Sequence, residues 1–484
     1  MPCNRANGNF NQKRMIKKLI EKYGLRNLIR FLITFIIYIL WVIWLGNYWF
    51  LLGLPIIVDI YLTKKVNWTP WKKREGKNHW LVEWLDALIF AVVAVTIINY
   101  FLFQNYKIPT GSMEKSLLVG DHLYVSKVAY GPRMPETPLS IPFMQHTIPG
   151  TDKRSYVEWI KLPYKRLAGT TEVKRDDPVV FNFPAGDTVC RDKNLQSVSW
   201  YFLIRQEAEG LKLLDKYAKQ PLKTDEEYYA LGRQELLKRE EIFVRPVDKR
   251  DNYIKRCVAI PGDSLQIIEG VVYVNGERQK EIPGIQYNFA VSTNGRRLNE
   301  KKLKDLGINA EDIQYNVQNS VLEVPLNETM AAELEKNRLV LGMEPLMSQK
   351  DFYNYQMFPH DPRYRWNLDH FGPIHIPKKG ETTPLTMENL PFYDRIIAYY
   401  EGNDLEVKDS TIYINGEPAT EYTFQMNYYW MMGDNRHRSL DSRYWGYVPE
   451  DHIVGKPKFV WLSLNQDKRF PLNIRLRRMF MRIR

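Results

Sequence analysis

Two residues in the chain have the types and neighbours that nucleophilic catalysis needs. Ser112 stands in the turn-like segment Lys107–Met113, a few residues after an apolar run that ends near Phe103. Lys255, within Asp251–Arg256, is a candidate base. A serine hydroxyl is a weak nucleophile until a base removes its proton. A lysine can act as that base if burial lowers its pKa enough for the neutral amine to exist near pH 7. The pair predicts a serine hydrolase anchored at a membrane.

Each residue alone also has an ordinary explanation, Ser112 as a turn serine and Lys255 as a solvated strand lysine. Tyr253, Ile254, Cys257 and Val258 surround the lysine in a strand-like run, which would place Lys255 on an apolar face. Histidine is the usual base, but the chain has only eight, and none lies in either segment.

Length and charge limit the classes of protein. The 484 residues suffice for one large core or for roughly two to three domains. A net charge of +12 suits either nucleic acid or an anionic membrane surface. Because the basic residues cluster beside apolar segments and at the C-terminus, the membrane is favoured and no nucleic acid partner is expected. No zinc-type spacing, Gly-rich phosphate loop or solenoid repeat is present, so no metal or organic cofactor is expected.

Three cysteines give little information about the redox environment. Cys190 and Cys257 are candidates for a disulfide outside the cytoplasm, whereas Cys3 lies near the N-terminus. Two separated cysteines are a weak signal for pairing, and unpaired thiols are the alternative.

Apolar runs near the N-terminus predict membrane helices. Leu28–Leu45 and Tyr48–Leu62 flank a Gly46-Asn47 turn and resemble a tight helical hairpin, with each arm near the lower length limit for a span. One long helix or a re-entrant hairpin is the alternative. Trp84–Phe103 is long enough for a full span and is the strongest of the three.

Positive charge predicts the orientation of these helices. One basic group lies before and at the start of the first run, and a second lies between the second and third runs. The members are Arg5, Lys13, Arg14, Lys17, Lys18, Lys22, Arg26 and Arg30, then Lys64, Lys65, Lys72, Lys73, Arg74 and Lys77. The positive-inside rule places both groups in the cytoplasm, so the third span exports the residues after it. No small-residue cleavage site comes after the first run, which argues against a cleavable signal peptide.

The predicted organisation therefore has five parts in a multi-pass protein of the cell (inner, cytoplasmic) membrane, with the exported part on the periplasmic or extracellular side. These are a basic cytoplasmic N-terminus (1–27), a transmembrane hairpin (28–63), a basic cytoplasmic loop (64–83), a transmembrane anchor (84–104) and an exported domain (105–484).

Alternating apolar and polar residues predict that the exported domain is mainly antiparallel β. His122–Val128 and Pro178–Phe183 alternate in this way, and Pro261-Gly262-Asp263 is a turn between two strands. Residues 270–277 and 410–417 each predict a strand closing on an Asn-Gly turn, either as a duplicated hairpin or by chance convergence.

Two stretches look inserted into this domain. Residues 195–245 have helical spacing around Trp200–Tyr217 and Glu226–Arg239, and residues 278–400 are polar and mixed. Both are expected to be solvated peripheral subdomains without chemistry of their own. The basic, amphipathic tail 475–484 is either a membrane-surface contact or a frayed end.

Four segments, in order, resemble the motifs of type I signal peptidase, the membrane-bound endopeptidase that removes signal peptides from exported proteins. The segments are Ile108–Met113 running on to Leu117 and Gly120-Asp121, Asp177–Phe181, Tyr253–Asp263, and Met432–Arg436 running through Ser439 to Pro449. The first and last are highly specific. The resemblance covers the third span and part of the exported region, and it implies N-terminal transmembrane helices, a mainly-β exported catalytic domain of the signal-peptidase and LexA-like kind, and α+β insertions.

Position by position, the resemblance implies roles for individual residues. Ser112 would be the nucleophile and Lys255 the general base, in a Ser/Lys dyad that forms an acyl-enzyme. Thr110 would share the oxyanion hole with the Ser112 N–H, and Ser439 would orient the lysine amine. Structural support is expected from Asp441, Arg443, Asp434 and Arg436.

The resemblance also implies the substrate and its binding groove. A signal peptide would bind extended, as an added strand, and be cut after small residues. The groove residues implied are Ile108, Pro109, Met113, Leu117, Tyr253 and Ile254, for each of which ordinary core packing is the alternative. The expected partners are signal peptides of exported preproteins, membrane lipids and the protein export machinery.

The chain departs from the family pattern at three places. Glu114-Lys115-Ser116 stands where a Pro-Thr pair is common, His437-Arg438 replaces an Asp-Asn pair, and Ala259 replaces a glycine. None of these changes removes a predicted catalytic group.

Two other classes of protein fit parts of the pattern. A soluble self-cleaving repressor of the LexA kind also has a Ser/Lys dyad, but it needs a DNA-binding domain and no membrane spans. A membrane-anchored binding protein on a decayed peptidase scaffold is the second rival, and the joint presence of Ser112, Lys255, Thr110 and Ser439 argues against it.

Overall fold

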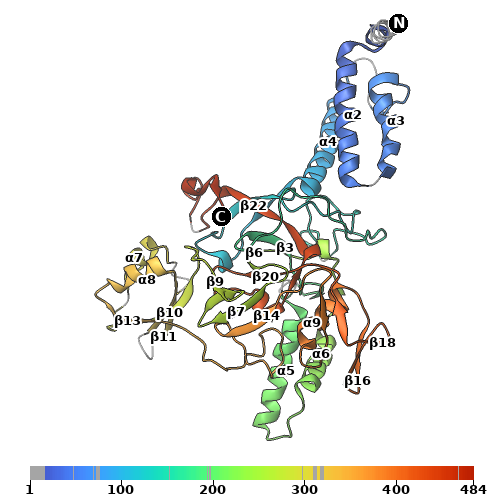
Figure 1. The fold of residues 1–484 in the computed structure, drawn as a ribbon. Helices are drawn as coiled ribbons and strands as arrows, with labels where there is room; N and C mark the ends of the chain where they lie inside the picture. Colours follow the sequence, from blue (N-terminus) through green and yellow to red (C-terminus); the bar gives the residue numbers. More distant parts are fainter. Residues whose placement is uncertain are drawn as a thin grey trace, which may run out of the picture. The chain divides into compact units, whose positions relative to one another are not determined.

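The computed structural model describes most of the chain. The described residues are 17–46, 48–68, 70–71, 77–151, 153–192, 195, 198–296, 298–308, 313–316, 321–466 and 468–483. Some residues with a predicted role lie outside the described part: Cys3, Arg5, Lys13, Arg14, Asn47, Lys72, Lys73, Arg74 and Arg484. The chain divides into two compact units, Met1–Thr96 and Ile97–Arg484 (Figure 1).

Unit 1 contains a long helix followed by a shorter, broken one. Helix α2 (Leu25–Leu45) ends at Gly46, whose positive φ of 61° allows the left-handed turn that begins the reversal. A 3-10 turn η1 (Tyr48–Gly53), α3 (Leu54–Val58) and a π turn η2 (Asp59–Thr63) come next. Thr34 Oγ1 donates to Tyr61 Oη at 3.2 Å, so the second run folds back along α2 and does not continue it as one long helix.

Two helices of the described part are long and apolar enough to cross a membrane, α2 and α4 (Trp80–Phe101). The run Tyr48–Thr63 is apolar but shorter. The spans predicted at Leu28–Leu45 and Trp84–Phe103 thus correspond to continuous helices, and the spanning of a membrane by the second run stays a prediction.

An antiparallel sheet of eight strands forms the centre of the described part of unit 2. Its order is β1-β2-β22-β3-β6-β20-β21, with β23 beside β22. The strands are β1 (Phe103–Lys107), β2 (Asp121–Ser126), β3 (Pro178–Asn182), β6 (Asn252–Ala259), β20 (Tyr428–Met432), β21 (Val448–Pro449), β22 (Ile453–Ser463) and β23 (Met481–Arg482). The strands predicted at His122–Val128 and Pro178–Phe183 are confirmed as β2 and β3, and the short β23 pairs the C-terminal tail with Phe459 and Val460 of β22.

Short helices and turns connect these strands. They are the 3-10 turns η3 (Gly111–Met113), η4 (Val247–Lys249), η7 (Glu450–His452) and η8 (Leu476–Arg478), the helices α9 (Leu390–Arg395) and α10 (Ser442–Trp445), and the π turn η6 (Ile396–Tyr400). Of these, η3 and α10 carry or adjoin residues of the sequence motifs.

The two predicted Asn-Gly hairpins are confirmed and share one geometry. One contains β7 (Ser264–Ile268), β8 (Val271–Val274) and β9 (Glu277–Arg278), and the other β16 (Leu405–Lys408), β17 (Thr411–Ile414) and β18 (Glu417–Pro418). Registers agree, with Leu265 opposite Val274 and Leu405 opposite Ile414. Asn275 and Asn415 each accept a backbone N–H, from Ser264 and Asp404, through the side-chain oxygen. The two hairpins thus share both their register and their turn contacts.

The stretch 195–245 forms a helical hairpin, as its spacing predicts. Helices α5 (Trp200–Tyr217) and α6 (Asp225–Arg239) come after β4 (Thr188–Cys190) and lead into β5 (Ile242–Val244). A capping box begins α6, where Thr224 and Glu227 each bond the other's backbone N–H.

The stretch 278–400 contains a small α+β subdomain. A sheet of order β11-β12-β10-β13 is formed by β10 (Tyr287–Thr293), β11 (Gln314–Asn316), β12 (Val321–Leu326) and β13 (Val340–Pro345). Helices α7 (Glu300–Asp305) and α8 (Glu328–Glu335) accompany it, around a core that includes Val291, Val324 and Leu334. Beyond it, β14 (Phe371–His375) pairs with β7, and β15 (Thr382–Pro384) pairs with β19 (Glu421–Thr423).

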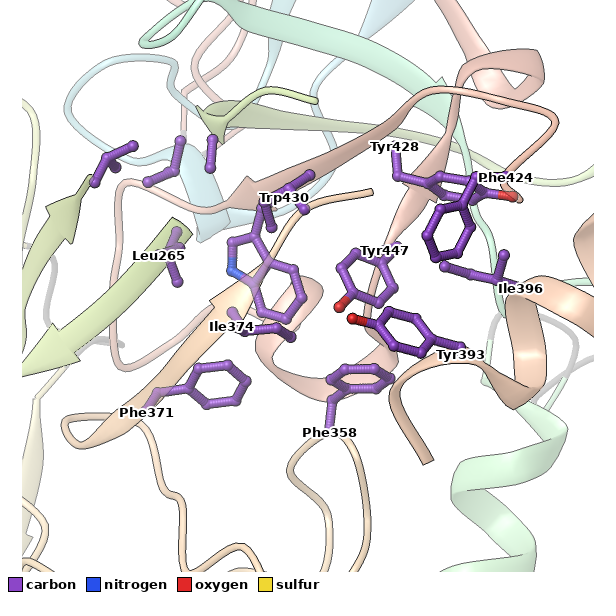
Figure 2. Close-up of a cluster of buried hydrophobic side chains, with 14 of the residues drawn as sticks. Leu265, Phe358, Phe371, Ile374, Tyr393, Ile396, Phe424, Tyr428, Trp430 and Tyr447 are labelled. Carbon is purple, nitrogen blue, oxygen red and sulfur yellow. The ribbon is translucent and has the colours of Figure 1, made fainter. Parts of the chain in front are cut away.

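A large aromatic core joins the later part of this stretch to the central sheet. Figure 2 shows Phe358, Phe371 and Tyr447 around Trp430, which has no exposed surface. The ring centroids of Phe371 and Tyr447 lie 5.4 and 5.7 Å from that of Trp430. Trp430 belongs to β20, so this core fixes the strand that leads into the last sequence motif.

Removing a ring from this core should destabilise unit 2. Phe358 is only 5% exposed and contacts Trp430 and Tyr447 edge-on. Phe358→Ala leaves a cavity and should cost about 3–5 kcal/mol, seen as a lower thermal unfolding temperature in detergent. Leu341→Ala, at a side chain 70% exposed on β13, is the matched control and should unfold as the wild type does. Equal unfolding temperatures for both variants would contradict this packing.

Candidate active site

The turn that carries Ser112 is held at both ends and anchored by apolar side chains. The Ile108 N–H donates to the Asp121 carbonyl at 2.8 Å, and the Gly120 N–H returns a bond to the Ile108 carbonyl at 2.9 Å. Met113 is fully buried. Because the apolar neighbour points inward, the short turn η3 presents the half-buried Ser112 toward β6.

Lys255 lies in the middle of β6, between β3 and β20, and its Nζ donates to Ser112 Oγ at 2.5 Å. The lysine is only 4% exposed. Burial lowers the pKa of Lys255 to about 8; the carboxylates of Asp441 and Asp434 oppose this shift, and Arg443 adds to it. A substantial fraction of the amine is therefore neutral near pH 7 to 8, as a general base requires.

The loop after β20 holds the other side of the serine turn. The Asn435 N–H donates to the Ser112 carbonyl at 3.1 Å, and its Nδ2 donates to the Gly111 carbonyl at 3.3 Å. Gly433 has no room for a side chain: an added Cβ would collide with Ser439 and lie 2.6 Å from the Ser112 carbonyl oxygen.

Two buried ion pairs support this loop. Arg443 donates to both carboxylate oxygens of Asp441 at 2.9 and 2.8 Å, and Asp441 also accepts the Gly433 N–H at 3.0 Å. Arg256 donates to both oxygens of Asp434 at 2.8 and 2.7 Å.

These contacts bring most of the predicted support residues to the lysine. Asp441, Arg443 and Asp434 lie close enough to affect its pKa. Arg436 lies next to them, fully buried, and its carbonyl accepts a bond from Arg443 at 2.5 Å.

Thr110 and Ser439 border the dyad without a direct bond to it. Thr110 is exposed and extended, with φ −128° and ψ 157°, immediately before the serine turn. Ser439 is buried against Gly433, and its Oγ donates to the Leu440 carbonyl at 3.5 Å, so a bond from Ser439 to the Lys255 amine is not formed in this arrangement.

The six predicted groove residues differ in their exposure. Pro109 is exposed, and Ile254 and Tyr253 are partly buried. The ring of Tyr253 stacks on Phe183 with centroids 4.5 Å apart. The remaining three pack in the core with Val125 and Val460: Ile108, Met113 and Leu117.

Sequence reasoning missed several residues that hold this site. Arg256 and Gly433 lie inside two of the sequence motifs, so their place in those motifs could have indicated that they belong to the site. Gln286 and Asp369 lie in the stretch 278–400 and contact the loop after β20. No pattern in the sequence indicated them, because both contacts join distant segments.

The described residues also show how candidate metal ligands and two of the cysteines are arranged. There, no group of three or more His, Cys, Asp or Glu side chains is arranged to hold a metal ion. Cys190 in β4 and Cys257 in β6 are both buried, unpaired thiols.

A serine hydroxyl bonded to a buried lysine amine is an arrangement found in serine hydrolases, and comparisons with known proteins agree with that class. The family model described as signal peptidase, peptidase S26, matches residues 81–328 and 421–462. The chain belongs to this family and is a type I signal peptidase, a serine endopeptidase.

Relatives named signal peptidase I match different shares of the chain. The protein of Haemophilus influenzae is 25% identical over 83% of this chain and 76% of its own length. That of Buchnera aphidicola subsp. Acyrthosiphon pisum is 22% identical over 90% and 93%. A third, from Buchnera aphidicola subsp. Schizaphis graminum, is 27% identical over 36% of this chain, and the match spans about half of the relative, 52%.

The lowered pKa of Lys255 predicts the pH dependence of the reaction. With the neutral amine as the proposed base, activity should be lost as pH falls through the pKa of about 8. We expect kcat/KM for a peptide substrate to rise about tenfold per pH unit below this value and to level off above it. A flat profile between about pH 6 and 9 would contradict this assignment, and Lys255→Arg, which stays charged, should be inactive throughout.

The close packing at Gly433 predicts a sensitive backbone position. Gly433→Ala pushes Ser439 and the Ser112 carbonyl apart, and displacement of Ser112, the predicted nucleophile, should lower kcat on the order of ten- to a hundredfold. Gly210→Ala is the matched control, because Gly210 lies in α5 with open space around its Cα. The first variant should lose activity while retaining its fold by circular dichroism, and the second should match the wild type. Full activity in Gly433→Ala would be inconsistent with this geometry.

Proposed function

We propose that this protein removes signal peptides from exported preproteins, cutting after small residues through an acyl-enzyme on Ser112. The observation that carries the proposal is the 2.5 Å bond between the buried Lys255 amine and the Ser112 hydroxyl. Membership of the S26 family and relatives named signal peptidase I support the choice of substrate.

The chemistry begins with a proton transfer. Neutral Lys255 takes the Ser112 proton, and Ser112 Oγ attacks the scissile carbonyl carbon to form a tetrahedral oxyanion. The Ser112 N–H and the Thr110 hydroxyl lie on the same turn and would donate hydrogen bonds to that oxyanion. The protonated Lys255 then gives its proton to the leaving amine, the C–N bond breaks, and the acyl-enzyme remains.

Deacylation repeats the cycle with water. Lys255 removes a proton from a water molecule, the resulting hydroxide attacks the ester carbonyl, and the Ser112 oxygen leaves and regains its proton from the lysine. Each half-reaction returns Lys255 to the neutral state, so the proposed cycle runs without a cofactor.

Substrate recognition is proposed to follow the edge of the site. An extended peptide would run past Pro109 and Thr110, which are exposed, with Tyr253 and Ile254 on the facing strand. The buried Met113 and Leu117 would shape the floor of the groove and need not touch the peptide. The proposed groove would favour alanine-sized side chains next to the cut. Ser439, which is buried beside Gly433, would orient the lysine amine.

The membrane arrangement is also part of the proposal. Cytoplasmic basic segments at 1–27 and 64–83 would leave the domain from residue 105 onward on the outer side, after a hairpin at 28–63 and an anchor at 84–104. The two apolar helices α2 and α4 support membrane attachment by length and composition.

A surface loop of unit 2 supports contact with lipid. Phe143 and Trp159 are 68% and 85% exposed, in a loop that also carries the exposed Lys161. Tyr100, near the end of α4, hydrogen-bonds with Ser140 of this loop at 3.2 Å, so the loop adjoins the point where the proposed span ends. Exposed aromatic and basic side chains together favour a membrane interface.

Cleavage of a preprotein tests the proposal directly. Wild type, Ser112→Ala and Lys255→Ala should be compared in liposomes, with the new N-terminus of the product identified by mass spectrometry. We expect the wild type to cut after a small residue and both variants to be inactive, because one lacks the nucleophile and the other the base.

Other outcomes would redirect the interpretation. If the wild type does not cut, or the variants cut equally well, the dyad is not the catalytic group. The non-catalytic binding protein then becomes the leading alternative. Thermal unfolding of each variant checks that inactivity does not come from misfolding.

A further inference from the structure

The small α+β subdomain approaches the serine turn very closely. An added Cβ on Gly284 would collide with the Ser116 hydroxyl, four residues after the nucleophile. The Gln286 Nε2 donates to the Glu114 carbonyl at 3.2 Å, and Lys115 Nζ donates to the Gly307 carbonyl. The segment Glu114-Lys115-Ser116, which departs from the family pattern, is thus the segment that this subdomain contacts.

Gln286 also holds the loop after β20 by its backbone. Its N–H donates to the Asp434 carbonyl at 2.8 Å, and its carbonyl accepts the Arg436 N–H at 2.9 Å. These two bonds form an isolated parallel β-bridge between Gln286 and Asn435. Asn435 is the residue that donates hydrogen bonds to the Ser112 and Gly111 carbonyls. Gln286 is completely buried, so water does not compete for these bonds.

His437, a second departure from the family pattern, is held by the same stretch. Its Nδ1 accepts the Asn288 N–H at 3.0 Å, and its Nε2 lies 2.7 Å from Asp369 Oδ1. Because Nδ1 is an acceptor here, the ring proton is on Nε2 and points to the carboxylate. The side chains of His437 and Asp369 are 7% and 2% exposed, so the bond is formed away from water.

We propose that this stretch, from Gly284 to Asp369, is a brace for the active-site loop, and that Asp369 and His437 are positioning residues for Ser112. The inference rests on the proposed function. The bond from Asp369 fixes His437, His437 fixes the end of the loop Gly433–Arg438, and Asn435 of that loop fixes the backbone of the serine turn.

The electrostatics of the pair restrict which residue fits at position 437. Asp369 is buried and also accepts the Ser348 N–H at 2.8 Å, so it needs a donor on its other oxygen. An aspartate at 437 would place two buried carboxylates together, and like charges of this kind repel strongly. The identity of residue 437 is therefore matched to the stretch that packs on it.

The test compares three substitutions at His437 in the full-length protein, with preprotein cleavage as the assay. His437→Gln keeps a donor aimed at Asp369 and should retain kcat within about threefold. His437→Ala loses the bond and should lower kcat about tenfold or more, and His437→Asp should lower it on the order of a hundredfold, with KM changed less than about twofold in both. Lys336→Ala, at an exposed side chain at the end of α8, is the control and should match the wild type.

A double variant separates positioning from simple damage. In Asp369→Asn/His437→Asp the amide can donate to the new carboxylate and the repulsion disappears, so kcat should recover about tenfold over His437→Asp alone. Equal kcat in the alanine and glutamine variants would overturn the proposal of a brace. A change confined to KM would also overturn it, because it would show that the stretch acts on substrate binding.

Failure of this inference and failure of the proposed function give different results. A wild type that does not cut the preprotein removes the function itself. A wild type that cuts, together with a His437→Asp variant that cuts equally fast, removes only the brace. If His437→Asp does not fold, as thermal unfolding would show, the glutamine and alanine variants alone decide the question.

Discussion

The burial of one amine is the constraint on which the rest of the site depends. Lys255 can act as the proposed base only because protein, and not water, surrounds its Nζ, and the central position of β6 provides this environment. A strand in the middle of a sheet has neighbouring strands on both sides, and the serine turn packs against the end of the lysine side chain. A more open arrangement would restore the ordinary pKa of a lysine and leave almost no neutral amine at neutral pH.

The charges around the lysine have to be neutralised for the same reason. Asp434 and Asp441 each raise the pKa of Lys255, which opposes the effect of burial. Both carboxylates are paired with arginines, Arg256 and Arg443, in bonds of 2.7–2.9 Å. Arg443 lowers the pKa of Lys255, in the same direction as burial, so the Asp441–Arg443 pair that holds the loop opposes that shift less than an unpaired Asp441 would. Asp434, Asp441 and Arg443 thus hold the loop and also affect the pKa of the proposed base.

The sequence predicted local elements well and long-range contacts poorly. Helices α5 and α6, strands β2 and β3, and both Asn-Gly hairpins follow from periodicity and turn residues, which act within a few positions. The meeting of Ser112 and Lys255, 143 positions apart, was expected from family motifs and not from any local pattern. The buried state of Met113 and the bond of Ser439 to Leu440 depend on how whole segments pack. Individual motifs do not contain that information.

The stretch between the lysine motif and the last motif illustrates this limit most clearly. The sequence of residues 278–400 is polar and mixed, and it predicted a solvated peripheral subdomain. In the structure Gln286 and Asp369 are buried against the loop that holds Ser112. Two of the three departures from the family motifs, at 114–116 and 437–438, lie where this stretch touches the site. A motif position can change when its neighbour changes with it, so a departure from a family pattern can mark a contact with a segment that the pattern does not include. The third departure, Ala259, pairs with Trp430 inside the central sheet.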